Sequence, residues 1–223
     1  MTGPADSEVP RPAPQGAGRS VSAFVAVRRC LEESRSLGFL GPGPVDQHLT
    51  HAKTHARIAL SKIPNPVATC DLGAGGGVPG LVLAAVSDSP ITLLDAMHKR
   101  TRFLADAILA LGFDHASVAT ARGEDFARAH ESAFQLVVAR SFGAPAVTAE
   151  IAVRMMTLDG VLCASAGPET LEGWRDGRLG ELGLALETEI VEEGATFVVV
   201  RKVADTAEMY PRRVGVPSKR PLW

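Results

Sequence analysis

A run of glycines in the first third of the chain places the strongest constraint on its fold. The segment Val67–Ala84, VATCDLGAGGGVPGLVLA, holds four glycines within residues 73–77. Each glycine costs roughly 0.5–1 kcal/mol relative to alanine in a regular element, so a cluster is expected where the backbone needs positive φ or approaches a ligand closely. An apolar run ends at Asp71, and a helical pattern begins at Pro79. We therefore predict a strand, a glycine turn and a helix whose N-terminal amides face a nucleotide.

The composition of the 223 residues limits the class of protein. Hydrophobic residues make up 46% and charged residues 22%, as in an ordinary globular domain. The formal net charge of −2 excludes a uniformly basic nucleic-acid binder, so polyanion contacts would need local basic clusters. Cys30, Cys70 and Cys163 form no CxxC pair, which argues against a disulfide framework and a thiolate metal site. No apolar run approaches the ~20 residues that span a bilayer, so we expect no membrane partner. We also expect a monomeric protein and a cytoplasmic location.

Periodicity and composition divide the chain into four segments. Residues 1–19 are rich in proline, glycine and alanine and are predicted to be a disordered tail. Residues 20–64 are predicted to form a helical cap, with one helix from Ser20 to Leu37 and another from Pro44 to Ile63. Residues 65–205 form the main domain. Residues 206–223 form a basic tail without a helical or strand period.

Strand and helix patterns alternate through the main domain. Apolar strands are expected at VATCDL, ITLLDA, ASVATA, FQLVVAR and GVLCASA, with helices between them. This order predicts an α/β fold with a doubly wound, mostly parallel, Rossmann-like sheet. Two late strands around ALETEIV and TFVVVRKV, separated by a short turn at Gly194, predict an antiparallel edge hairpin. Ligands of such sheets bind beyond the carboxyl ends of the strands.

The spacing of the glycines narrows the choice of nucleotide. The dinucleotide pattern G-x-G-x-x-G fails at Val78, and the Gly-Lys-Ser/Thr ending of a phosphate-binding P-loop is absent. An acid two residues before G-x-G-x-G resembles the first motif of class I S-adenosylmethionine-dependent methyltransferases. Asp95 ends the next strand about twenty residues later, where a carboxylate can bind the ribose hydroxyls. The alternative for Asp95 is an N-cap of the helix that follows.

Several longer segments together resemble one family. DLGAGGGVPGLVLA, LLDAMHKRTRFL, ARGEDF, FQLVVARSF and YPRRVGVPSKRPL are similar to the GidB/RsmG family of small-subunit (16S) ribosomal RNA methyltransferases, which methylate N7 of a guanine. The resemblance extends from residue 45 to 223. It implies S-adenosyl-L-methionine as cofactor and ribosomal RNA or the small ribosomal subunit as partner. The candidate cofactor-binding residues are Asp71, Gly73, Gly75, Gly77, Val78, Asp95, Ala96, Gly123, Glu124 and Arg140.

The amino-terminal part departs from the family pattern. The Trp-Asn and Asn-Leu-Thr motifs that usually precede the first strand are missing, since the chain has one asparagine, Asn65, and tryptophans only at Trp174 and Trp223. Three alternatives therefore stay open: a methyltransferase for another RNA or a small molecule, a non-catalytic cofactor-binding ribosome-assembly factor, and a nicotinamide oxidoreductase. Val78 and Asp71 disfavour the last.

The expected reaction needs positioning more than acid–base catalysis. Guanine N7 carries an in-plane lone pair at neutral pH and can attack a sulfonium methyl without first losing a proton. In-line placement can contribute roughly 7–11 kcal/mol, so we expect no general base. Arg140, at the end of an apolar strand, is the candidate polar residue, and it would bind a carboxylate or an RNA phosphate. The alternative is an ion pair with Glu124.

Two further groups of polar residues are conspicuous. His48, His51 and His55 share one helix face, for which we predict contact with RNA or solvent and no metal site, because no further ligand is apparent. The second group is basic and is predicted to form an RNA-binding rim on the carboxyl edge of the sheet; it comprises Lys99, Arg100, Arg102, Arg212, Arg213, Lys219 and Arg220. Alternatively, the tail only pins the chain end to the domain.

Overall fold

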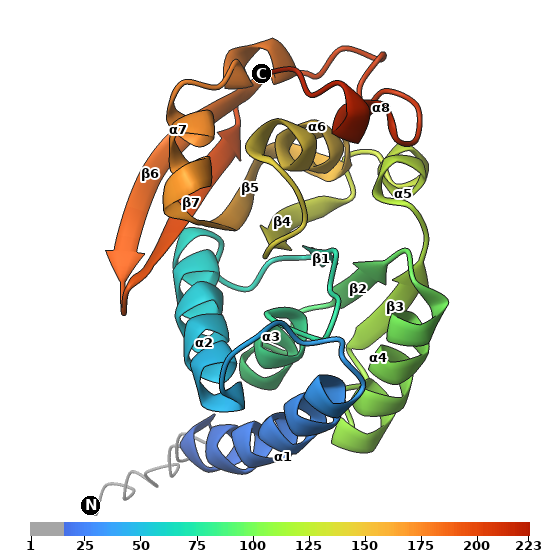
Figure 1. The fold of residues 1–223 in the computed structure, drawn as a ribbon, viewed down its shortest axis with the longest axis vertical. Coiled ribbons are helices and arrows are strands. Elements are labelled where there is room, and N and C mark those ends of the chain that lie inside the picture. The colour runs from blue at the N-terminus through green and yellow to red at the C-terminus, as the bar shows by residue number, and fades with distance from the viewer. Residues whose placement is uncertain (1–15) are drawn as a thin grey trace, which may run out of the picture.

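A seven-stranded sheet forms the centre of the computed structural model, which describes residues 16–223 (Figure 1). The strand order is β3-β2-β1-β4-β5-β7-β6. Strands β1 to β5 are parallel, and β7 runs antiparallel to both β5 and β6. The bounds are β1 Thr69–Leu72, β2 Ile91–Asp95, β3 Ala116–Thr120, β4 Phe134–Ala139, β5 Met156–Ala166, β6 Leu184–Glu192 and β7 Ala195–Lys202. The predicted α/β class, with its doubly wound sheet and antiparallel edge hairpin, is confirmed.

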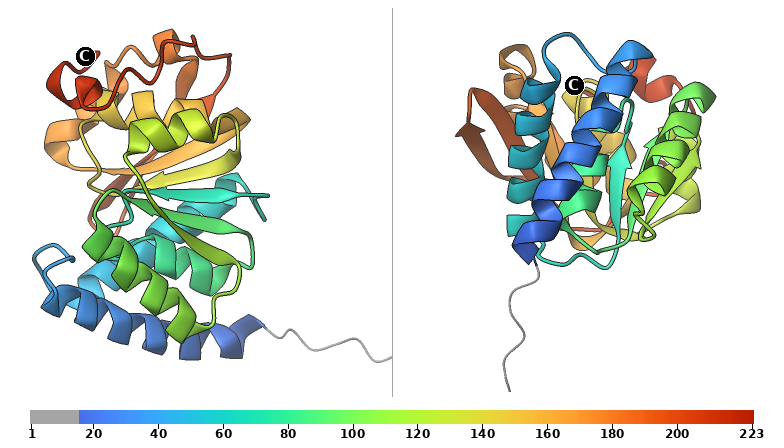
Figure 2. Two further views of the ribbon diagram at one scale, coloured as in Figure 1. Left: turned by 90° about the vertical axis from the view of Figure 1, so that its right-hand side faces the viewer. Right: turned by 90° about the horizontal axis from the view of Figure 1, so that it is seen from below.

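Helices cover both faces of the sheet and make three layers (Figure 2). One hydrophobic core packs α1 to α4 against one face, and a second packs α5 to α7 against the other. The bounds are α1 Gly16–Ser36, α2 Val45–Lys62, α3 Gly80–Val86, α4 His98–Leu111, α5 Gly123–Ala129, α6 Pro145–Met155 and α7 Pro168–Arg175. Burial on both faces explains why β4 consists almost entirely of apolar residues.

The first two helices, which the sequence predicted as a helical cap, pack against α3 and α4. Val27 and Leu31 of α1 and Ala52 and Ala56 of α2 are fully or almost fully buried in the core that they share with α3 and α4. Helix α1 begins at Gly16, four residues earlier than predicted, so residues 16–19 are helical and not part of a tail. The rest of the predicted disordered tail lies outside the described residues.

The short loop between β6 and β7 explains why these strands form an antiparallel hairpin. Two residues, Glu193 and Gly194, join β6 to β7, and both have positive φ. So short a loop can only connect antiparallel strands, because a parallel crossover needs a dozen or more residues. The hairpin adds β7 beside β5 and leaves β6 at the edge.

The C-terminal segment, residues 206–223, folds back across the face that carries α5 to α7. It contains a one-turn helix, α8 (Val216–Lys219), where no regular element was predicted. Tyr210 is buried, and the Trp223 indole N–H donates to the Gly173 carbonyl oxygen at 2.7 Å. Both ends of this segment therefore contact the rest of the domain. No helix of the described residues has the length and apolar character needed to cross a bilayer.

Candidate active site

The glycine turn between β1 and α3 has the backbone geometry that its sequence requires. Gly73, Gly75 and Gly77 all have positive φ, at 77°, 53° and 97°. The N–H of Gly75 donates to Asp95 Oδ2 at 3.0 Å, so the turn is joined to the end of β2. The N–H of Gly80, at the start of α3, donates to a carboxylate oxygen of Asp71 at 2.8 Å. Asp71 and Asp95, the two acids expected at the ends of apolar strands, therefore each form a hydrogen bond that holds the turn.

Helix α1 supports the turn from the other side. The Ser34 hydroxyl donates to the Gly76 carbonyl oxygen at 2.9 Å. A Cβ at Gly76 would lie only 2.8 Å from the Phe39 carbonyl oxygen, so this glycine allows the close packing of the loop after α1. The amino-terminal region thus fixes the position of the turn.

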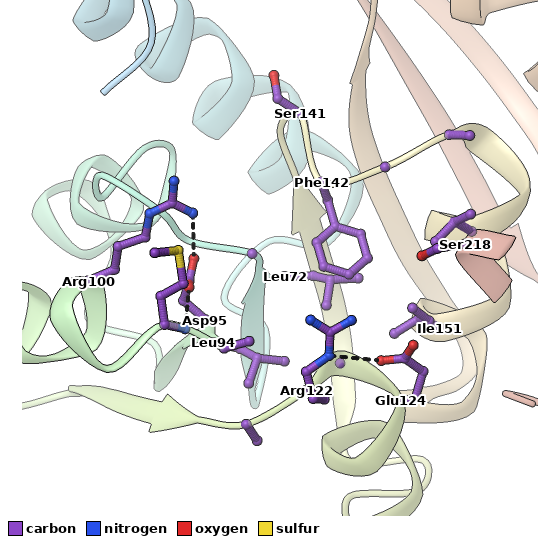
Figure 3. A pocket seen from close by; sticks show the side chains of 18 residues that line it. Leu72, Leu94, Asp95, Arg100, Arg122, Glu124, Ser141, Phe142, Ile151 and Ser218 are labelled. Carbon is purple, nitrogen blue, oxygen red and sulfur yellow. Dashed lines mark hydrogen bonds and ion pairs between the residues drawn. The ribbon is translucent and has the colours of Figure 1, made fainter. Parts of the chain in front are cut away.

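A cavity of about 460 Å³ opens beside the turn at the carboxyl ends of β1, β2, β3 and β4 (Figure 3). Its walls are apolar at Leu72, Leu94 and Ile151, while the Asp95–Arg100 and Arg122–Glu124 pairs supply charge. This position is where a doubly wound sheet binds nucleotides. The volume lies within the roughly 300–1,000 Å³ of small-molecule sites.

The structure brings five of the ten candidate cofactor residues to the cavity wall. These five are Gly73, Asp95, Ala96, Gly123 and Glu124. The other five lie beside or behind the wall. Asp71 and Gly75 hold the turn, Gly77 packs against Leu81, and Val78 is buried in the core that α1 to α4 cover. Arg140 lies in neighbouring cavities.

Asp95 is prepared to accept further hydrogen bonds. Its carboxylate accepts from the N–H groups of Gly75 and Met97, at 3.0 and 2.8 Å, and Arg100 lies 3.5 Å away. A carboxylate has about four lone-pair sites and three of them are in use, so acceptor capacity is left for a ribose hydroxyl. The N-cap of α4 is Met97, so the alternative role of Asp95 as N-cap is wrong.

Glu124 links the cavity to the C-terminal segment. Its side chain is buried, and its carboxylate accepts from the Gly215 N–H at 2.8 Å while Arg122 lies 3.9 Å away. Ser218, from the same segment, lines the cavity. Gly123 lines the cavity beside Ile151, and a Cβ there would lie 3.0 Å from the Ile151 side chain.

Arg140 does not pair with Glu124, which corrects the alternative considered above. One guanidinium nitrogen, Nη2, donates to His48 Nδ1 at 2.6 Å, and Nη1 is buried without a partner among the described residues. His48 Nε2 donates in turn to the Gly41 carbonyl oxygen at 3.1 Å, which fixes the tautomer that accepts from Arg140. Burial lowers the pKa of Arg140, against the opposing effect of Asp71. The buried Nη1 therefore keeps unused hydrogen-bond donors.

Two of the three histidines of α2, His48 and His55, are buried in the interior, and His51 is partly buried. His48 is 6% exposed and His55 is fully buried, with Nε2 donating to the Cys163 carbonyl oxygen at 2.9 Å. Burial, with smaller effects from Arg140, lowers the pKa of His51 to about 4 and that of His55 to about 3. Both are neutral near pH 7. No group of three or more potential metal ligands occurs among the described residues.

Asp71 carries an unusual charge state for a carboxyl group. It is fully buried, and burial raises its pKa to about 7, with the Gly80 hydrogen bond opposing and the Asp95 charge adding to the shift. Its Oδ1 has no partner among the described residues. Because the folded pKa lies above the unfolded one, this group stabilises the fold in acid, and that stability is lost as pH rises through about 7.

Sequence reasoning missed several residues of the cavity wall. Ser141, Phe142 and Gly143 follow β4 directly, and the Phe142 ring packs so closely over Gly73 that a Cβ there would lie 2.5 Å from Cδ2. Their position just after a parallel strand was the available signal. Ser218 carried no such signal, because only the folding-back of the C-terminal segment brings it here.

The seven basic residues of the predicted rim have different environments. Six of them are exposed or line the cavity: Arg100 lines the cavity beside Asp95, and the exposed five are Lys99, Arg102, Arg213, Lys219 and Arg220. Arg212 forms a bidentate pair with the fully buried Glu150, at 2.6 and 2.9 Å. Arg212 is therefore part of the tail's attachment.

Comparison with known proteins decides the family. A family model described as GidB, rRNA small subunit methyltransferase G, matches residues 45–179. The chain belongs to this family. The match begins where the sequence resemblance was expected to begin and ends before the tail.

Relatives in several bacteria agree with this family assignment. The ribosomal RNA small subunit methyltransferase G of Thermotoga neapolitana is 36% identical over 160 residues, which cover 68% of this chain and 70% of the relative. The protein of that description from Lactobacillus helveticus is 32% identical over 164 residues, covering 69% and 68%. The missing amino-terminal motifs do not remove the chain from the family.

Solved structures of methyltransferases share the fold. The O-methyltransferase of Bacillus cereus, solved in complex with SAH, has a TM-score of 0.60 and 11% identity, covering 80% of this chain and 90% of that one. A putative O-methyltransferase from Klebsiella pneumoniae has the same TM-score at 13% identity and the same coverage. At this identity the likeness shows the class I methyltransferase fold.

The cavity fits the S-adenosylmethionine that this family uses. In this cavity the Asp95 carboxylate has free acceptor capacity, and Leu94 and Ile151 form apolar walls suited to an adenine. Arg140, whose Nη1 is buried and unpaired, lines the adjacent cavities. These features match a ribose, a base and a carboxylate in turn.

Proposed function

We propose that this protein acts as a monomer and transfers the methyl group of S-adenosylmethionine to N7 of a guanine in small-subunit ribosomal RNA. The observation that carries the proposal is the cavity at the glycine turn, with Asp95 joined to the Gly75 N–H in a chain of this family. Naked RNA and the assembled small subunit are both candidate substrates.

Each part of the cofactor has a candidate partner. Asp95 would bind the ribose hydroxyls, and Gly123 and Glu124 would border the adenine. Arg140 would bind the methionine carboxylate through its free Nη1, with His48 holding the guanidinium in place. A bound carboxylate would neutralise Arg140, whose positive charge would otherwise oppose a reaction that makes the base cationic.

The residues of this chain supply position and electrostatics. Bound S-adenosylmethionine supplies an electrophilic methyl on a sulfonium sulfur. Arg140 and Asp95 anchor the two ends of the cofactor, and the 141–143 segment forms a wall between its cavity and the next one. No side chain needs to remove a proton, because N7 is already unprotonated. Holding the reacting atoms at about 3–3.5 Å can contribute roughly 7–11 kcal/mol.

The proposed function predicts a specific modified nucleoside. Purified protein incubated with S-adenosylmethionine and small ribosomal subunits should produce 7-methylguanosine, measured by nucleoside mass spectrometry. Calorimetry should show tighter binding of S-adenosylmethionine than of NAD. Cofactor binding without any methylated nucleoside, in naked RNA or subunits, would favour a non-catalytic assembly factor instead.

We further propose that the exposed cations of the tail contact RNA phosphates. Changing Arg213, Lys219 and Arg220 together to glutamine should weaken RNA binding and flatten its salt dependence by up to ~0.7 log units per lost single-strand contact. Fluorescence anisotropy across a salt series measures this slope. Arg201→Gln, on the edge hairpin where Arg201 pairs with Glu187, is the control and should leave the slope unchanged. An unaltered slope in the triple variant would mean that RNA binds elsewhere.

A further inference from the structure

A second cavity lies beside the cofactor cavity, and among the residues that line it only Arg140 has a proposed role in cofactor binding. Its volume is about 370 Å³, and it shares Ser141, Phe142 and Gly143 with the cofactor cavity. Arg140 and His51 border it on the α2 side, and its far wall comes from the end of β5 and the start of α7. The end of the cofactor that Arg140 would hold is therefore the end that faces this cavity.

The second cavity has a largely polar lining, and some of its polar groups have no partner among the described residues. Glu169, in the first turn of α7, lines the cavity, and its carboxylate forms no hydrogen bond or ion pair with any described residue. A Cβ at Gly167 would lie 3.4 Å from a Glu169 carboxylate oxygen, which places this oxygen over the loop before α7. His51 Nδ1 is buried without a partner in the described chain, whereas the Glu169 side chain is exposed. An unsatisfied buried polar atom such as His51 Nδ1 costs about 1–3 kcal/mol, so a polar ligand that reaches it is favoured.

The Glu169 carboxylate matches one edge of guanine. Guanine offers two adjacent donors, N1–H and the N2 amino group, to a single carboxylate, whereas adenine presents an unprotonated N1 that would repel it. Methylation at N7 leaves a positive charge on the base. A carboxylate at the N1 edge would therefore bind the product-like transition state more strongly than the neutral base.

The geometry points to this cavity as the site of the acceptor guanine, with Glu169 accepting from N1–H and N2–H. The inference rests on the proposed function and assigns its substrate site. The base enters unstacked from its neighbours, as in other enzymes that act on a base. In the transfer step the N7–carbon bond forms with the N7 lone pair, the carbon–sulfur bond breaks, and the sulfur keeps its electron pair. No proton moves.

Glu169→Gln tests this assignment, because glutamine keeps the size but loses the charge. The variant should lower kcat/KM for small-subunit RNA by roughly 10- to 100-fold, the range for a hydrogen bond to a charged group, with the Kd for S-adenosylmethionine unchanged. Glu172→Gln is the matched control: Glu172 is on α7 too but pairs with Arg175 at 2.9 Å and lies outside the cavity. It should behave as wild type.

A binding measurement separates this inference from the proposed function. Calorimetry with 7-methylguanosine monophosphate and with guanosine monophosphate should show that wild type prefers the cationic methylated base and that Glu169→Gln loses the preference. That result supports the site even if the wild type forms no 7-methylguanosine in RNA. Equal binding of the two nucleotides by wild type and variant, or an unchanged kcat/KM in Glu169→Gln, would overturn it.

Discussion

Replacing Arg212 by glutamine should lower the free energy of unfolding by about 3–5 kcal/mol, the range for removing one partner of a buried ion pair. Glu150 is fully buried in α6 and accepts from the Arg212 guanidinium and from its backbone N–H at 2.8 Å. Without the Arg212 guanidinium, the buried Glu150 carboxylate keeps only the backbone N–H of residue 212 as a hydrogen-bond donor. For a domain of this size the melting temperature should fall by roughly 6–20 °C, measured by calorimetry.

Two further variants isolate the ion pair as the cause. Arg213→Gln changes the neighbouring residue, which is exposed and forms no side-chain bond with the described residues, and it should alter stability by less than about 0.5 kcal/mol. The double variant Glu150→Gln with Arg212→Gln removes both charges and should be more stable than Arg212→Gln alone. A melting temperature of Arg212→Gln equal to that of wild type would show that Arg212 is free to bind RNA, as the sequence suggested.

Replacing Gly75 by valine should weaken S-adenosylmethionine binding by roughly 10- to 150-fold, the equivalent of one hydrogen bond to a charged group. A branched side chain is strained at the φ of 53° that Gly75 adopts. When the backbone shifts to relieve this strain, the Gly75 N–H moves away from Asp95 Oδ2 and their hydrogen bond is lost. The Asp95 carboxylate, which is proposed to bind the ribose, then loses the contact that positions it. Calorimetric titration with the cofactor measures the change.

Gly194→Val provides a control with the same backbone strain. Gly194 has a φ of 74° in the edge hairpin, and a Cβ there would meet nothing within 4 Å. Both variants should lose about 1–2 kcal/mol of stability, but only Gly75→Val should lose cofactor affinity. Loss of affinity in both would point to a general weakening of the fold, and retention in both would place the cofactor elsewhere.

Local sequence was sufficient to predict the elements that form the cofactor cavity. The glycines after β1 need positive φ, which few other residues adopt, and Asp95 ends a short apolar strand. Both signals lie within a few residues of the feature they predict. The parallel order of the strands then brings their carboxyl ends, and so Gly73, Asp95, Gly123 and Glu124, to one edge.

Pairing between distant segments was decided only by the tertiary structure. A spacing of i, i+3 and i+7 places His48, His51 and His55 on one helix face, but that face packs inward because α2 covers β5 and the hairpin. Likewise, charge in the tail predicted RNA contact for Arg212, while Glu150, 62 residues away, determines its actual partner. Periodicity reports which residues share a face; burial and ion pairing depend on what the rest of the chain places against that face.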